Sequence, residues 1–165
     1  MSDRVQTIRQ HRLAIAKEMY LEGVTFVNKE SKTSLISAII NFDYAVETIL
    51  KGVILQNNIP LGRSKTFPEL VKDILGLKKN VSNAIIEQIN ALHDLRNNVQ
   101  HQAVIPSLDE VIKHRNTVSL FIDDICNTFY NNSITFDSIS LNYLVDTQIE
   151  RIILDEMEKA ISELG

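Results

Sequence analysis

The sequence contains few of the residues on which disulfide-linked and loop-rich folds depend. Its 165 residues include one cysteine, five glycines, three prolines and no tryptophan. The single Cys126 excludes an internal disulfide and a cysteine-rich zinc site, so we expect a reducing compartment. The N-terminus has no uninterrupted apolar run of the signal-peptide kind, and no stretch is long and apolar enough to span a bilayer. We therefore expect a cytoplasmic protein that makes no membrane contact.

Positive charge is also in short supply. Lysine and arginine number 17 against 21 acidic residues, which gives a net charge of −4. This balance argues against a non-specific nucleic-acid binder that works through a broad basic surface, but it leaves room for a local basic cleft. Hydrophobic residues make up 44% of the chain, which is typical of one globular domain with a real core.

Apolar residues recur at three- and four-residue steps along most of the chain, which predicts an all-α fold. Capping residues mark where several helices begin, and Pro106 marks where one ends. We expect an up-and-down bundle of four to five core helices over residues 1–132. A C-terminal helical extension, residues 133–165, is expected to follow and to lead into a further domain if the protein is longer. The expected core helices cover residues 3–30, 33–56, 66–75, 82–105 and 107–130.

The second of these helices is apolar on most sides, which predicts a central position against several neighbours. Its polar line consists of Asp43, Glu47 and Lys51, spaced four residues apart. The favoured interpretation is an exposed ladder of acid–base pairs along the helix. The alternative places Asp43 or Glu47 against Arg96, as the partner that an inward-facing arginine needs.

Arg96 is the anomaly of the fourth expected helix. At 100° per residue it lies about 20° from Ile85, in the middle of an apolar stripe that also contains Ile89, Leu92 and Val99. A guanidinium keeps its charge and is costly to bury without partners, so the position calls for a reason. His93, Asn97 and His101 follow at four-residue steps along one edge of the same stripe.

These residue types are suited to phosphodiester cleavage without a metal. His101 can take a proton from a ribose 2′-hydroxyl or give one to the leaving oxygen, and Arg96 can stabilise the additional negative charge of the transition state. Asn97 can orient the histidine or the phosphate. Such a reaction works only on RNA and leaves a 2′,3′-cyclic phosphate. Acid–base work on both oxygens needs two groups, and two copies of the chain across a twofold axis would supply them.

The other classes of site are missing from the sequence. There is no glycine-rich phosphate loop, no G-x-S-x-G motif and no histidine pair with a carboxylate at metal-binding spacing. His93 and His101 are about 12 Å apart along a helix, too far to share a metal easily. We therefore expect no metal and no other cofactor.

The run Arg96-Asn97-Asn98-Val99-Gln100-His101 resembles the R-x(4–6)-H motif of the HEPN superfamily, in which a polar residue follows the arginine. The order of helices across residues 31–130 also resembles the bundle of that family. The resemblance implies a homodimer with a composite, metal-independent ribonuclease site, often in a toxin or antiphage effector whose partner is an antitoxin or sensor protein. It makes Arg96 and His101 catalytic and Asn97 supporting. One departure is Ala103, which stands where members paired with nucleotidyltransferase antitoxins have a tyrosine; control by modification of that tyrosine is therefore in doubt.

Four further residues are candidates for contact with the RNA substrate. His93 and Gln100 lie in the same helix as the motif, and Lys78 and Lys79 belong to a local cluster of cations around the short third helix. The alternative to the ribonuclease is a non-catalytic HEPN-like interaction or dimerisation module. In that case Arg96 is a buried, hydrogen-bonded structural arginine and His101 caps the helix end.

Overall fold

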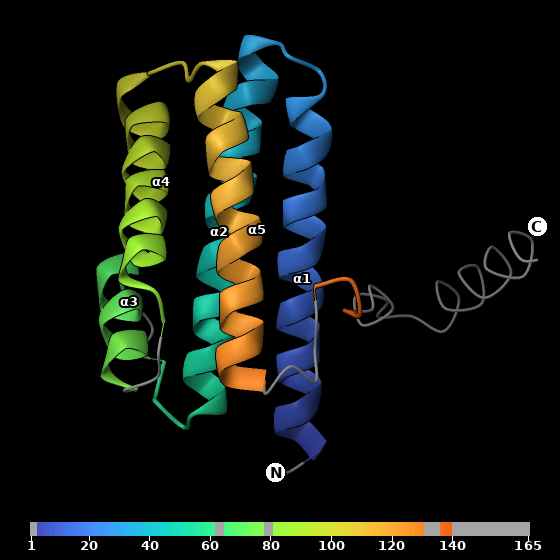
Figure 1. Ribbon diagram of the computed structural model, residues 1–165, viewed down its shortest axis with the longest axis vertical. Helices are drawn as coiled ribbons and strands as arrows, with labels where there is room; N and C mark the ends of the chain where they lie inside the picture. Colours follow the sequence, from blue (N-terminus) through green and yellow to red (C-terminus); the bar gives the residue numbers. More distant parts are fainter. Residues whose placement is uncertain (1–2, 62–64, 78–80, 131–135, 140–165) are drawn as a thin grey trace, which may run out of the picture.

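The computed structural model describes residues 3–61, 65–77, 81–130 and 136–139, with the side chains of residues 3–10 left aside. The described chain is all-α, as the sequence predicts (Figure 1). Its helices are α1 (Asp3–Val27), α2 (Lys32–Gln56), α3 (Phe67–Gly76), α4 (Asn83–Gln102) and α5 (Leu108–Tyr130).

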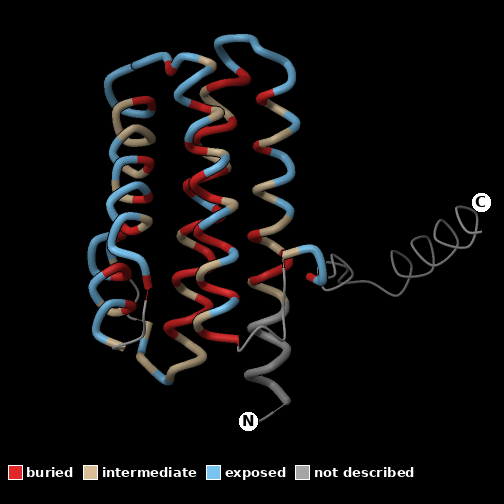
Figure 2. Tube along the Cα trace, in the orientation of Figure 1, coloured by how far each residue is buried: buried red, intermediate tan, exposed pale blue. Residues whose placement is uncertain are grey.

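The four long helices α1, α2, α4 and α5 lie side by side with alternating chain direction, and the short α3 lies beside the first half of α4 (Figure 1). This is the up-and-down bundle expected from the sequence. Helix α2 packs against each of the other four helices. Most of its residues are buried, and Figure 2 shows buried positions concentrated along the central helices. The central position predicted for this helix is confirmed.

Side-chain caps set the beginnings of three helices where the sequence predicts them. The Ser31 hydroxyl accepts the backbone N–H of Ser34 at the start of α2. Glu69 accepts from the backbone N–H and the hydroxyl of Thr66 at 2.7 and 2.8 Å. Before α5, Glu110 accepts in the same way from Ser107 at 2.9 Å. These bonds satisfy N–H groups that a helix start would otherwise leave unpaired.

Helix α4 ends earlier than the sequence predicts. Its last residue is Gln102, because Ala103 adopts a left-handed conformation with φ of 55°. The backbone N–H groups of Ala103 and Val104 both donate to the carbonyl of Asn98. This turn satisfies the carbonyl and leaves Ala103 exposed. Helix α1 likewise ends at Val27 rather than Glu30.

Some sequence predictions lie outside the described residues. These are Lys78, Lys79 and the predicted C-terminal helix. A short described segment, residues 136–139, lies against α1, where the Lys17 ammonium donates to the carbonyls of Asp137 and Ile139. Within the described ranges, no helix is long and apolar enough to cross a membrane.

Candidate functional site

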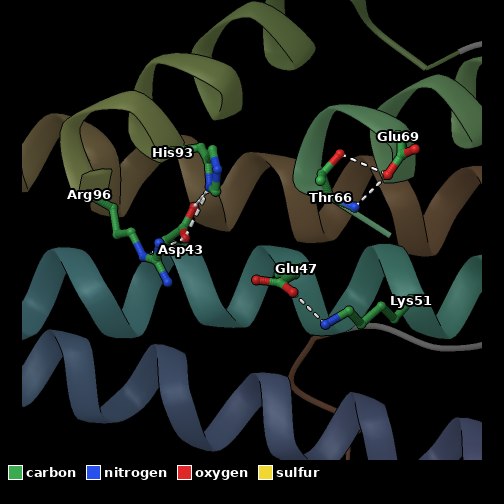
Figure 3. Close-up of polar contacts among 7 residues, drawn as sticks. All are labelled: Asp43, Glu47, Lys51, Thr66, Glu69, His93 and Arg96. Carbon is green, nitrogen blue, oxygen red and sulfur yellow. Dashed lines mark hydrogen bonds and ion pairs between the residues drawn. The ribbon is translucent and has the colours of Figure 1, made fainter. Parts of the chain in front are cut away.

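The Asp43 carboxylate is the centre of the polar cluster that joins α2 to α4 (Figure 3). Asp43 is only 1% exposed. Its Oδ1 accepts a hydrogen bond from Nδ1 of His93 at 3.0 Å, and its Oδ2 lies 3.4 Å from Nε of Arg96. One buried carboxylate therefore contacts both His93 and Arg96 of α4.

This contact decides between the two interpretations of the polar line on α2. Asp43 is the partner of Arg96, so the exposed-ladder interpretation is wrong for this residue. Glu47 instead pairs with Lys51 one turn further along α2, as the ladder predicts. Figure 3 shows the two carboxylates facing different partners. The difference arises because α4 crosses α2 at Asp43 and not at Glu47.

Burial has a direct electrostatic consequence for Asp43. The loss of solvent raises the pKa of its carboxyl, and the charges and hydrogen bond of His93 and Arg96 oppose that rise. Glu47 adds a smaller contribution that also raises the pKa of Asp43. The carboxylate is thus an expensive buried charge that its two α4 partners stabilise.

His93 is held from two sides. Its ring stacks on the Phe67 ring at the start of α3, with centroids 4.0 Å apart and planes 5° from parallel. Its Nδ1 is bonded to Asp43, and 17% of its side chain stays exposed. The stacking fixes the ring plane and the hydrogen bond fixes its rotation. His93 is therefore a positioned group rather than a freely rotating surface histidine.

The remaining motif residues lie at the solvent side of the cluster. The Arg96 side chain is 29% exposed, and its Nη1 donates to the side-chain oxygen of Asn97 at 3.0 Å. Gln100 and His101 are exposed in the last turn of α4. In the described part of the chain, no hydrogen bond or ion pair engages His101, so the helix-capping role is not seen. The structure joins His93, Arg96 and Asn97 in one cluster and leaves His101 separate.

Sequence reasoning missed one residue of this cluster. Nothing in the sequence spacing connects Phe67 with His93, 26 positions later. An aromatic residue directly after the Thr66 cap was the available signal. The stacking depends on how α3 folds back against α4, which one-dimensional periodicity does not encode.

Cys126 is a small buried residue and not a candidate nucleophile. It is buried on α5, and burial raises the pKa of its thiol to about 11. A thiol of this kind stays protonated at neutral pH and is a poor nucleophile. Over the residues with a described position, no group of three or more His, Cys, Asp or Glu is arranged to hold a metal ion.

Comparison with known proteins adds no relative to this picture: no family model, curated protein or solved structure matches the chain.

Proposed function

We propose that the protein is a metal-independent endoribonuclease of the HEPN type that acts as a homodimer. The observation that carries the proposal is that Arg96 is held by internal partners and is still partly exposed. It lies on the inward edge of α4, yet 29% of its side chain is exposed, and Asp43 and Asn97 hold its guanidinium in place. Such an arginine is oriented before substrate arrives, which is what stabilisation of a phosphate transition state requires.

Arg96 keeps donors for a phosphate after its internal contacts are made. A guanidinium has five N–H donors in a fixed fork. The described contacts use Nε, toward Asp43, and one N–H of Nη1, toward Asn97. The outer edge of the fork is the part that can face a phosphodiester, where two parallel N–H bonds favour the developing charge.

His101 supplies the proton-transfer group of the motif. It is exposed in the last turn of α4, five residues after Arg96. Five residues correspond to a rotation of about 140° around the helix, so the two side chains of one copy point in different directions. A twofold dimer that brings two α4 helices together would place His101 of one copy near Arg96 of the other. The proposal therefore includes a composite site between subunits.

The cellular role follows from the same proposal. A ribonuclease that cleaves RNA without a metal is suited to a toxin or antiphage effector in the cytoplasm, restrained by an antitoxin or a sensor protein. Ala103 makes restraint through a tyrosine at that position unavailable to this chain.

A second candidate function is a non-catalytic helical interaction module. The ion pair between Arg96 and Asp43 favours it, because a paired arginine needs no substrate to explain its position. In this account the Asp43 cluster only ties α4 to α2, and the exposed end of α4 contacts a protein partner.

Cleavage of a mixed RNA pool in EDTA distinguishes the two candidates. The ribonuclease proposal predicts cleavage by the wild type and a loss on the order of 10²-fold or more in Arg96→Ala and in His101→Ala. Arg115→Ala is the matched control, since Arg115 lies on α5 and, among the described residues, its side chain hydrogen-bonds only to its neighbour Asn116. Cleavage that is absent, or that survives both motif substitutions, leaves the interaction module as the better account.

A further inference from the structure

We propose that His93 is the general base of the site, that buried Asp43 is its positioning residue, and that the acid opposite it is His101 of a second copy. The inference rests on the proposed ribonuclease function and names a group that the six-residue motif does not contain. It answers a chemical need, because one histidine cannot serve the attacking and the leaving oxygen at the same time.

The hydrogen bond to Asp43 sets the protonation pattern of the His93 ring. A carboxylate oxygen only accepts, so Nδ1 of His93 carries the hydrogen in the 3.0 Å bond. In the neutral ring Nε2 then has the free lone pair, which is the form a general base needs. The carboxylate also stabilises the imidazolium that forms when Nε2 takes a proton. Asp43 is suited to this role because its contact with solvent is almost nil.

The ring of His93 is also held rigidly enough to act at a defined point. Phe67 stacks on one face at 4.0 Å, and Asp43 bonds one ring nitrogen, so rotation of the ring would break one contact or the other. Of the side chain, 17% stays exposed to solvent, and the proposal requires a ribose to approach Nε2 from this side. A histidine whose only role were to fill the core would not need both restraints and an opening to solvent.

His93 and His101 of one chain are poorly placed to act on the same phosphate. They are eight residues apart, which is about 12 Å along α4 and about 80° around it. His93 is held toward α2 and α3, whereas His101 points into solvent. In the proposed dimer, a twofold axis would place His93 of one chain opposite His101 of the other.

The reaction then balances with these groups alone. Nε2 of His93 accepts the proton of the ribose 2′-hydroxyl as the 2′-oxygen forms its bond to phosphorus. The bond from phosphorus to the 5′-oxygen breaks, and protonated His101 of the second copy donates its proton to that oxygen. Arg96 stabilises the negative charge on the non-bridging oxygens. The products are a 2′,3′-cyclic phosphate and a 5′-hydroxyl.

Heterodimers assembled from two differently tagged chains test whether each site combines residues of both subunits. A dimer of one His93→Gln chain and one His101→Ala chain retains one intact site of two, so about half of the wild-type rate on a mixed RNA pool is expected. A dimer of one wild-type chain and one chain with both substitutions has no intact site and is expected to be inactive. The opposite pattern, in which the first dimer is inactive and the second retains half the rate, overturns the assignment to two subunits.

The leaving group distinguishes the base from the acid. The test substrate is an RNA in which sulfur replaces the 5′-bridging oxygen at a linkage that the wild type cleaves. The resulting thiolate leaves without receiving a proton. His101→Ala is expected to recover most of its lost rate on this substrate. His93→Gln and Asp43→Asn are expected to keep their losses, on the order of 10²-fold or more for His93→Gln, because the 2′-hydroxyl still needs its base. If His93→Gln also recovers its lost rate on this substrate, His93 acts on the leaving group and is not the base.

Two results separate failure of this inference from failure of the proposed function. If His93→Gln folds with an unchanged unfolding midpoint and cleaves RNA at the wild-type rate, while His101→Ala does not cleave, His93 is not the base and the ribonuclease stands. If His93→Gln does not fold, Asp43→Asn gives the same comparison with the ring retained. If the wild type does not cleave RNA, both the function and this inference are wrong.

Discussion

Nδ1 of His93 lies 3.0 Å from Oδ1 of Asp43, across the boundary between α4 and α2. The same carboxylate lies 3.4 Å from Nε of Arg96, so two residues of α4 contact a residue of a different helix, 50 positions before His93. A small change at Asp43 therefore affects both His93 and Arg96. Stability and the geometry of the candidate site are coupled through this carboxylate.

Asp43→Ala is expected to lower the free energy of unfolding by about 1–3 kcal/mol at neutral pH. The substitution removes the acceptor of His93 and the partner of Arg96. The loss stays below that of a fully buried pair, since both partners retain some exposure and a costly buried charge is also removed. Urea denaturation followed by circular dichroism measures the change.

Glu47→Ala is the matched control for this substitution. It removes a carboxylate from the same helix one turn later, where the partner Lys51 and Glu47 itself are both partly exposed. An effect of less than about 1 kcal/mol is expected. Equal losses in the two variants would show that Asp43 gains nothing special from its α4 partners.

These two acids show how far the sequence could be read. Asp43 and Glu47 are four residues apart on one line of α2, so the sequence alone does not show which of them pairs with Arg96. The ladder interpretation therefore applied to both. The apolar composition of α2 correctly predicted that it lies at the centre. Which of its polar residues meets Arg96 depends on the angle and height at which α4 crosses, and these are properties of the packed bundle.

Gly23 marks a close approach of α1 to α2. A Cβ at this position would lie 2.5 Å from a ring carbon of the buried Phe42. Gly23→Ala is expected to cost about 1–3 kcal/mol of stability because the ring must shift within a filled core. Thermal unfolding measures it. Gly52→Ala is the control, since the nearest atom there is at an ordinary 3.7 Å and alanine favours the helix, so no loss is expected.

Ala103 is strained at the end of α4. Its φ of 55° is left-handed, a conformation that costs a non-glycine residue roughly 1 kcal/mol. Ala103→Gly is therefore expected to raise the unfolding free energy by about 0.5–1 kcal/mol. Ala91→Gly, at an exposed position inside the same helix, is expected to lower it by about 1 kcal/mol. A decrease in both variants would rule out the left-handed cap.

His114 gives a pH dependence to stability. It is buried on α5, and burial lowers its pKa from the ordinary value of 6.5, assisted by Lys113 and opposed by Glu110. The unfolded chain then binds the proton more readily, so this group makes the protein less stable as pH falls below about 6.5. His114→Gln is expected to flatten the decline between pH 7 and pH 5. An unchanged slope in His114→Gln would contradict this assignment.

Features that depend only on residues close together in the sequence could be predicted from it. The Thr66–Glu69 and Ser107–Glu110 pairs predicted helix starts because each bond closes within four residues. The burial of His114 is not decided locally, because the face that α5 turns inward is set by the neighbouring helices.

The chemical ends of the cleavage products test the central claim most directly. A mixed RNA pool is incubated with the purified protein in EDTA, and the new termini are identified by enzymatic labelling and mass spectrometry. Attack by the 2′-hydroxyl, with Arg96 and His101 as proposed, predicts 2′,3′-cyclic phosphates on one side of each cut and 5′-hydroxyls on the other. RNA that stays intact, or fragments that carry 5′-phosphates, would contradict the account.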